Sequence, residues 1–339
     1  MFSAVGQRDV AIDLGTTNTL IYVEGQGVLL SEPSMVARDR ATKEPIAVGS
    51  EAKFMMGRTP ANIEVIRPLS DGVITEFEAC EQMLRYFVAK AIPSRRLGKP
   101  RMVICVPSGI SAVEHRSVRD AAEFAGARDS VIVEEPVAAA IGAGLPIHHA
   151  AGNLVIDIGG GTTEVAVLSL GGVVSSRSDK VGGLAMDDAI IEYARKEYNL
   201  ALGERTAEEI KIKLGSACPM PTEFEAEIRG RDLVTGLPKT VVTTTAEIRE
   251  ALSEPVAAIV DALKFTLDAT PPELAADCMD RGITLVGGGS LLAGMDRRLN
   301  IETGMPIRKV ADPLEVVVVG SAKFLASYDS LQALAAAKS

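Results

Sequence analysis

Two segments of the chain share one pattern of hydrophobic and polar positions. Residues 10–23 read VAIDLGTTNTLIYV, and residues 155–168 read VIDIGGGTTEVAVL. In each segment an apolar run ends in Asp, an apolar residue and Gly follow, and a turn that contains Thr leads into a second apolar run. Runs of this composition are typical of strands, so each segment is predicted to form a β-hairpin. The repeat predicts two related domains, each opening with the same hairpin.

The two predicted hairpin tips are candidate phosphate-binding loops. A P-loop or a dinucleotide fingerprint would place a helix directly after its glycines, whereas strands follow here. Successive backbone N–H groups in such a tip form a concavity that binds anions, and glycine permits the positive φ angles that this shape requires. The aspartates that end the strands, Asp13 and Asp157, suit a Mg²⁺ ion held through water. One such tip alone is more often a plain tight turn, but two matched copies favour phosphate binding.

A third glycine cluster follows the short apolar run of residues 283–286. It consists of Gly287, Gly288, Gly289 and Ser290, and residues 291–295 come next. This order predicts a strand, a turn and a helix. The glycines would let a flat base lie against bare backbone, although a flexible connection has the same composition.

A pair of carboxylates ends another predicted strand, residues 131–134. Glu134 and Glu135 precede Pro136, which is predicted at the first helical position, where helices accept proline. Glu135 is then at or near the N-cap. Helix capping and complementing the helix dipole would explain it, and so would orienting the attacking water in phosphoryl hydrolysis.

The rest of the chain alternates between strand and helix patterns, which predicts an α/β fold. The expected helices cover residues 70–91, 113–125, 187–198, 205–216, 248–267 and 321–337. The expected buried strands cover residues 102–107 and 316–319, and residues 224–245 are expected to form a two-stranded unit.

Composition narrows the class of protein. The 339 residues are 47% hydrophobic and 24% charged, as in an ordinary globular protein of two or three domains. Aromatic residues make up only 4%, and the net charge is −10, which argues against nucleic-acid binding. The four cysteines form no C-x-x-C pair, and neither a signal peptide nor an apolar run of ~20 residues is present, so a reduced, cytoplasmic protein is expected.

The motifs, taken in this order, resemble those of the actin, sugar-kinase and heat-shock-chaperone ATPase superfamily. Within it, the chain is identified as a member of the MreB family of bacterial actin-like rod-shape proteins, Mbl-type paralogs included. The resemblance extends over essentially the whole chain. Its most specific stretches are residues 12–19, 57–60, 66–69, 71–74, 134–142, 157–164, 203–211 and 236–240.

The resemblance implies an α/β, actin-like ATPase fold. Two related ribonuclease-H-like domains would each carry an inserted subdomain, with the nucleotide in the cleft between the domains. Domain I would comprise residues 1–148 and 322–339, with an insertion at about 32–72. Domain II would comprise residues 149–321, with an insertion at about 187–246.

The resemblance also implies roles for individual residues. Asp13 and Asp157 would flank Mg²⁺ through water, and Glu135 would position the hydrolytic water with help from Thr162. The phosphates of ATP would be held by Gly15, Thr16, Thr17 and Asn18 and by Gly159, Gly160, Gly161 and Thr162. The nucleoside would be contacted by Glu208, Glu209 and Lys211 and backed by Gly287, Gly288, Gly289 and Ser290.

The function implied is slow ATP hydrolysis coupled to polymerisation. The protein would form a homopolymer of paired protofilaments at the inner face of the cytoplasmic membrane and organise the cell-wall elongation machinery. A paralog that binds nucleotide structurally and acts as a scaffold is the alternative, because Leu184 and Ala185 stand where relatives carry acidic residues near the ribose. Two other functions occur in the same superfamily. A small-molecule kinase would need a second, sugar-binding motif, which is not seen here, and a chaperone would need a peptide-binding domain, which makes it a less favoured alternative.

Two segments bear on membrane binding. Relatives often use an N-terminal amphipathic helix, but residues 1–6 are too short for one to form alone. In the loop at residues 93–100, where relatives often have two large apolar residues, this chain has Leu97 with Arg95, Arg96 and Lys99. These cations could attract an anionic leaflet, or the loop could be a solvated turn.

Overall fold

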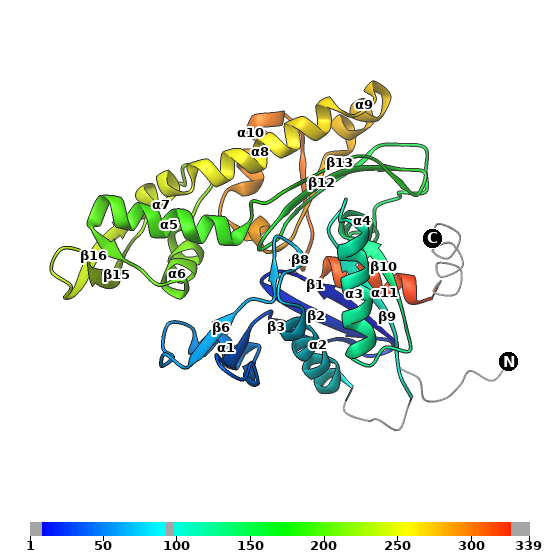
Figure 1. The fold of residues 1–339 in the computed structure, drawn as a ribbon. Coiled ribbons are helices and arrows are strands. Elements are labelled where there is room, and N and C mark those ends of the chain that lie inside the picture. Colours follow the sequence, from blue (N-terminus) through cyan, green and yellow to red (C-terminus); the bar gives the residue numbers. More distant parts are fainter. Residues whose placement is uncertain (1–8, 93–97, 327–339) are drawn as a thin grey trace. The chain divides into compact units, whose positions relative to one another are not determined.

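Both predicted hairpins are confirmed. The first consists of β1 (Val10–Leu14) and β2 (Asn18–Val23), and the second of β11 (Asn153–Ile158) and β12 (Thr163–Ser169). The computed structural model (Figure 1) describes residues 9–92 and 98–326. These residues fall into two compact units. Unit 1 is drawn from Met1–Ala150, Leu168–Val173 and Leu314–Ser339, and unit 2 from Ala151–Val167 and Val174–Pro313.

Unit 1 is built on a five-stranded sheet with the order β10-β9-β1-β2-β3. The three further strands are β3 (Gly27–Pro33), β9 (Arg101–Val106) and β10 (Asp129–Glu134). Strand β9 pairs in parallel with β1 and β10, whereas β2 is antiparallel to β1 and β3. Strand β1 is therefore central, and its carboxyl end carries the first hairpin tip.

Helices pack on both faces of this sheet (Figure 1). They are α2 (Phe77–Ala91), α3 (Ala112–Phe124), α4 (Glu135–Gly142) and α11 (Val316–Leu325). Val10 and Ile12 of β1 share a core with buried residues of α2 and α3. Because side chains alternate along a strand, Ala11 and Asp13 face the other side, where α11 contacts β1 and α4.

Unit 1 also holds two small sheets between β3 and α2. One has the order β5-β4-β6 and the other pairs β7 with β8. The strands are β4 (Val36–Asp39), β5 (Pro45–Val48), β6 (Ile63–Ile66), β7 (Leu69–Ser70) and β8 (Val73–Ile74). Helix α1 (Ser50–Met55) connects β5 to β6.

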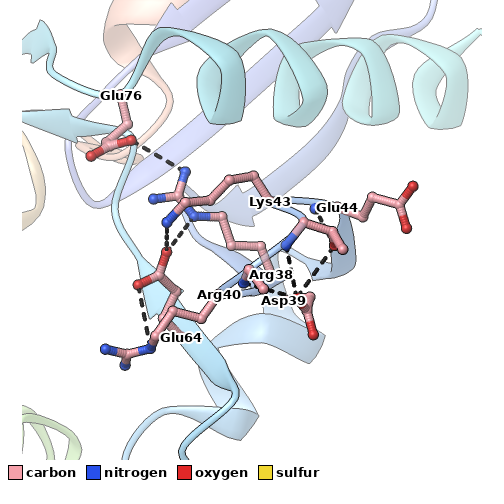
Figure 2. A network of polar contacts seen from close by, with 9 residues as sticks. Arg38, Asp39, Arg40, Lys43, Glu44, Glu64 and Glu76 are labelled. Carbon is pink, nitrogen blue, oxygen red and sulfur yellow. Dashed lines mark hydrogen bonds and ion pairs between the residues drawn. The ribbon is translucent and has the colours of Figure 1, made fainter.

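An arginine fastens the β5-β4-β6 sheet to α2 (Figure 2). Arg38 on β4 is 6% exposed. Its Nε donates to Glu64 on β6 at 2.7 Å, and its Nη1 donates to Glu76, the residue before α2, at 3.2 Å. Lys43 Nζ also donates to Glu64, at 2.8 Å. The β5-β4-β6 sheet is thus joined to the start of α2 by a charge-assisted bond.

Unit 2 repeats the plan of unit 1 with a sheet of order β13-β12-β11-β17-β18. The further strands are β13 (Gly172–Asp179), β17 (Ile283–Val286) and β18 (Ile307–Lys309). Strand β17 is parallel to β11 and β18. In both units the hairpin and two parallel strands therefore occupy equivalent places, as the repeat in the sequence predicts.

The remaining elements of unit 2 form its helices and a small sheet. The helices are α5 (Gly183–Tyr198), α6 (Glu204–Leu214), α7 (Thr245–Ala251), α8 (Ser253–Asp268), α9 (Pro272–Arg281) and α10 (Met295–Thr303), with the 3₁₀ turn η2 (Gly288–Leu291). The small sheet has the order β14-β15-β16, from β14 (Leu200–Ala201), β15 (Glu225–Asp232) and β16 (Pro238–Thr244).

One turn occurs in both units with the same hydrogen bonds. Residues 39–45 read DRATKEP and residues 232–238 read DLVTGLP. In each, one carboxylate oxygen of the Asp accepts from the backbone N–H groups two and three residues later and from the hydroxyl of the following Thr, at 2.8–3.3 Å. These hydrogen bonds hold the pKa of Asp39 and of Asp232 below the ordinary value. In both turns the bond from the backbone N–H of the Thr has the largest effect on the pKa.

Several predicted elements are wrong at their ends or in type. Residues 316–319 begin helix α11 rather than form a strand, because a fully buried apolar run has no period that separates the two. The predicted helix 248–267 is two helices, since Pro255 has no N–H to donate to residue 251. The helix predicted from Ser70 begins at Phe77, after the β7–β8 turn, and the two-stranded unit gains β14 as a third strand.

Candidate functional site

The first predicted phosphate loop connects β1 to β2 in unit 1. A Cβ atom at Gly15 would lie 2.7 Å from the carbonyl oxygen of Asn18, so only glycine allows this tight closure. Asp13 precedes the loop and is paired on both sides, with Leu20 of β2 and Cys105 of β9. The strand thus fixes where the carboxylate stands relative to the loop.

A second layer of hydrogen bonds supports this loop, and sequence reasoning missed it. The Ser34 hydroxyl donates to the Gly15 carbonyl at 2.6 Å and shares a bond of 2.8 Å with the Thr19 hydroxyl. The Thr16 hydroxyl accepts from the backbone N–H of Gly72 at 2.8 Å. One signal was available for Gly72. The dipeptide Asp71-Gly72 has φ angles of 52° and 76° and links two strands, as Asp-Gly does in hairpins with two-residue turns.

Two properties of the loop fit an anionic ligand with a divalent cation. The Thr17 hydroxyl is buried and has no hydrogen-bond partner among the residues that the structure describes. A buried hydroxyl without a partner is costly, and a phosphate oxygen would satisfy it. Burial also raises the pKa of the Asp13 carboxyl above its ordinary value, and a nearby cation would restore its charged form.

Glu135 is the first residue of α4, directly after β10. The structure makes Glu134 the N-cap and Pro136 the second helical residue, one position later than predicted. Glu135 is 9% exposed. The helix that carries it is fixed by close contact with α11, because a Cβ atom at Gly142 would overlap the Val316 carbonyl oxygen.

The second predicted phosphate loop connects β11 to β12 in unit 2. The Gly159 N–H donates to the Thr162 carbonyl at 2.8 Å, which closes the loop. A Cβ atom at Gly159 would lie 3.2 Å from that oxygen, as one at Gly15 would lie 2.7 Å from the Asn18 oxygen in unit 1. Asp157 and Thr162 are each 7% exposed. The Thr163 hydroxyl donates to the Val181 carbonyl at 2.6 Å. This hydrogen bond connects the end of the loop to the segment that precedes α5.

The predicted base platform meets the end of β11. Strands β11 and β17 pair in parallel with Asp157 opposite Val286, which places Gly287 next to the aspartate. A Cβ atom at Gly287 would overlap Asp157 Oδ1, and its φ of 81° also requires glycine. The structure thus brings together the predicted metal-binding aspartate and residues 287–290 within unit 2. The segment continues as the turn η2, and the helix α10 starts only at Met295.

The predicted nucleoside residues on α6 have different surroundings. Glu208 and Lys211 are three residues apart and share a face of the helix. The Lys211 ammonium donates to the Gly183 carbonyl at 2.7 Å and lies 2.8 Å from Asp187 Oδ1. Glu209 instead is exposed and pairs with Arg205 at 2.9 Å.

Helix α5 starts four residues before the predicted Asp187. Its first turn contains Leu184 and Ala185, both partly exposed, and the Leu184 N–H donates to the Gly160 carbonyl at 2.8 Å. Leu184 and Ala185 therefore adjoin the second predicted phosphate loop.

The expected membrane-binding segments are mostly beyond what the structure describes. Residues 1–6 and the cations Arg95 and Arg96 lie outside the described residues, whereas Lys99 is described and exposed. In the described part of the chain, no helix combines the length and apolar composition needed to cross a membrane.

Comparison with known proteins decides the family. The family model of the MreB/Mbl protein matches residues 7–333. The chain belongs to the MreB/Mbl family. It is 50% identical over 324 residues to the cell shape-determining protein Mbl of Bacillus cereus, which covers 96% of this chain and 97% of the relative. It is also 50% identical over 334 residues to the cell shape-determining protein MreB of Escherichia coli K12, with 97% and 96% covered.

Solved structures of MreB/Mbl relatives and of another filament protein share the fold. MreB5 of Spiroplasma citri bound to ADP is 39% identical, with a TM-score of 0.90 over 95% of this chain and 97% of that chain. The same protein bound to AMPPNP has a TM-score of 0.91 at 38% identity. The MamK double helical filament, at 21% identity and a TM-score of 0.78, supports the fold alone. The α/β, actin-like fold expected from the sequence is confirmed, and the family is one of cell shape-determining, cytoskeletal proteins.

Proposed function

We propose that this chain binds Mg²⁺–ATP and hydrolyses it slowly. One observation supports this most strongly: each unit carries an Asp-x-Gly loop at the end of a central strand, and in each loop the glycine lies close to the carbonyl oxygen three residues later. Relatives bound to ADP and AMPPNP support nucleotide binding in the same fold. Loops of this kind offer backbone N–H groups to anions. The buried Thr17 hydroxyl, which has no hydrogen-bond partner among the described residues, adds a donor.

In this proposal the phosphates are shared between the two loops. Residues Gly15 to Asn18 donate from unit 1, and residues Gly159 to Thr162 donate from unit 2. Asp13 and Asp157 hold Mg²⁺ through water, and the ion, when bound, offsets the negative charge of the phosphates.

Hydrolysis needs a group that orients water, and Glu135 takes this role. Its carboxylate accepts a hydrogen bond from the water that attacks the γ-phosphorus, and the Thr162 hydroxyl assists. The rigid position of α4 against α11 keeps this carboxylate in place.

The nucleoside is held by unit 2 in this proposal. Residues Gly287 to Ser290 back the base, where the absence of side chains leaves a flat backbone surface. Glu208 and Glu209 provide polar groups from α6, whereas Lys211 of the same helix donates to the Gly183 carbonyl at the start of α5. Glu209 would have to leave its exposed pair with Arg205 to take part, an exchange that costs little.

Nucleotide state would control assembly of the chain with itself. Filaments of paired protofilaments form with ATP and weaken after hydrolysis, which is a population shift driven by γ-phosphate contacts. These filaments lie on the inner face of the cytoplasmic membrane and organise the cell-wall elongation machinery. The cell shape-determining relatives support this role, and exposed Lys99 is the described part of the basic loop that would approach anionic lipid.

The hydrolytic role is tested by Glu135→Ala with Glu134→Ala as the matched control. Glu134 is adjacent and exposed, so its loss should leave turnover nearly unchanged. Glu135→Ala should slow phosphate release about 100-fold while ATP binding stays intact, as expected for a positioned acid–base group. Unchanged turnover in Glu135→Ala would remove this residue from the mechanism.

The scaffold alternative rests on Leu184 and Ala185, which give the first turn of α5 no carboxylate. A pelleting assay with Mg²⁺–ATP and a phosphate readout separates the two functions. Filaments with phosphate release support the ATPase, and filaments without release support a structural nucleotide.

A further inference from the structure

The start of helix α5 and the second phosphate loop are joined backbone to backbone. The Gly183 N–H donates to the Gly159 carbonyl at 3.0 Å, and the Leu184 N–H donates to the Gly160 carbonyl at 2.8 Å. A Cβ atom at Gly182 would lie 2.6 Å from the Gly159 carbonyl oxygen, so no side chain separates the two segments. A displacement of the α5 N-terminus is therefore passed directly to the loop.

Lys211, on the neighbouring helix α6, binds the N-terminus of α5. Its Nζ donates to the carbonyl of Gly183, the residue whose own N–H holds the loop, at 2.7 Å. The same ammonium lies 2.8 Å from Asp187 Oδ1, one turn further along α5. The side chains of Lys211 and Asp187 are 15% and 8% exposed. A mostly buried ammonium thus joins α6 to two groups of α5, through a hydrogen bond to the Gly183 carbonyl and an ion pair with Asp187.

We infer that Lys211 is a positioning residue for the second phosphate loop, acting through Gly183, rather than principally a contact of the nucleoside. The inference rests on the proposed nucleotide site. Without the ammonium, the part-buried Gly183 carbonyl would lose its donor, and the buried Asp187 carboxylate would lose its counter-charge. The first turn of α5 would then shift to recover hydrogen bonds, and the Gly159 and Gly160 carbonyls would shift with it. Phosphate affinity would fall, although Lys211 itself need not touch a phosphate.

The experiment separates phosphate from nucleoside by using each alone. Binding of Mg²⁺–ATP, of Mg²⁺–tripolyphosphate and of adenosine is measured by competition against a fluorescent ATP analogue, on the full chain and on Lys211→Met. A positioning role predicts that Lys211→Met weakens ATP and tripolyphosphate by about 10-fold or more, the usual cost of disturbing a supporting contact. Adenosine should weaken less than about twofold. Loss of adenosine affinity with unchanged tripolyphosphate affinity would overturn the inference, as would no loss for either probe.

Three variants keep the test decisive. Glu208→Gln, on the same face of α6, should show the opposite pattern, with weaker adenosine and unchanged tripolyphosphate. Lys211→Arg keeps the charge and the donors and should restore tripolyphosphate binding to within about threefold. If Lys211→Met fails to fold, Asp187→Asn releases the charge but keeps an acceptor, and it should give the same selectivity with a smaller loss.

Amide hydrogen exchange at residues 159–162 should rise in Lys211→Met and stay low in Glu208→Gln. A wild-type chain that binds none of the three ligands would instead disprove the proposed nucleotide site.

Discussion

At the scale of single residues, Arg38 is a buried charge of unit 1 that is held by two carboxylates. It is buried on β4 and bridges a carboxylate on β6 and a carboxylate that precedes α2 (Figure 2). Arg40, two positions further along the chain, has a side chain that is 62% exposed, and its Nε lies 3.9 Å from the same Glu64. The two arginines thus share a partner but differ in burial, which decides how much each pair stabilises.

We expect Arg38→Met to lower the local unfolding free energy by about 1.5 kcal/mol, because it removes two hydrogen bonds made by a buried charged group. The loss is no larger because Glu64 keeps its bond to Lys43 and the Glu76 side chain is 49% exposed. Arg40→Met should change it by less than about 0.5 kcal/mol. Hydrogen exchange of the β4 and β6 amides measures both, since it reports local opening. Equal effects of the two substitutions would show that burial of Arg38 does not matter.

Glu64 gives a pH dependence with a definite sign. Hydrogen bonds from Lys43 and Arg38 lower the pKa of Glu64 to about 2, below the ordinary value of about 4.3 in an unfolded chain. A group whose folded pKa is lowered stabilises the fold above its unfolded pKa, and this contribution is lost as pH falls through the folded pKa. The stability difference between wild type and Glu64→Gln should be constant at pH 6–7 and shrink between about pH 4 and pH 2.

Urea denaturation followed by circular dichroism at several pH values measures this difference, and other carboxylates cancel because both proteins contain them. A difference that grows as the pH falls would contradict the sign.

The same scale shows why the residues around Glu208 and Lys211 do not reveal their surroundings. Their roles were implied by the family resemblance, because a spacing of three residues indicates only a shared helix face. The partners of Lys211 are contributed by α5 at Gly183 and Asp187, and nothing local in residues 204–214 encodes how two helices pack. Ser34 was missed for the same reason, since its hydroxyl reaches Gly15 across the sheet.

At the scale of elements, α4 and α11 cross at two glycines. A Cβ atom at Gly320 would overlap the Ala138 carbonyl oxygen, and one at Gly142 would overlap the Val316 carbonyl oxygen. The backbones of the two helices therefore touch. The residues 316–319 that read as a strand are buried in this crossing, where packing outweighs the modest helix penalty of β-branched residues.

Gly320→Ala should destabilise the fold by about 3 kcal/mol, because the overlap is with backbone that cannot rotate away. Phosphate release should also slow, since α4 carries Glu135 at its first position. Gly172→Ala is the control: its nearest atom would be the Ser169 carbonyl oxygen at 4.0 Å, and it should change stability by less than about 0.5 kcal/mol. Urea denaturation and a phosphate assay measure the two effects. Wild-type behaviour of Gly320→Ala would mean that the helices can separate at little cost.

The duplicated turn shows a signal that periodicity does not capture. Asp39 and Asp232 lie in D-x-x-T-x-x-P segments whose hydrogen bonds match one for one. The fifth residue has a positive φ in both, at Lys43 and Gly236. Because Asp and Thr side chains bond the backbone of their own turn, the spacing of these two residues predicts the turn even where one copy lacks glycine.

At the scale of the whole molecule, the repeat of two hairpins predicted two related units, and the sheets have equivalent strand orders. Local pattern identified strands β1, β2, β11 and β12 because each is short, apolar and bounded by a glycine turn. It did not identify which parallel strands join each hairpin, because β9 and β17 reach β1 and β11 across long connections. The nucleotide roles came from resemblance, since one loop alone does not distinguish a phosphate site from a turn.

Nucleotide binding should affect the loops of both units at once. If ATP binds loops from both, saturating Mg²⁺–ATP should protect the amides of residues 15–18 in unit 1 and of residues 159–162 in unit 2 to a similar degree. At 100 times the dissociation constant the stabilisation should be about 2.7 kcal/mol, because ligand that binds only the folded state adds to stability by mass action.

Hydrogen exchange measures the two loops separately in the same sample. Removing Mg²⁺ with EDTA should weaken protection of both loops together, since Asp13 and Asp157 are proposed to share one ion through water. Protection confined to one loop would mean that a single unit binds the nucleotide, and the matched hairpins would then be a shared fold without a shared ligand.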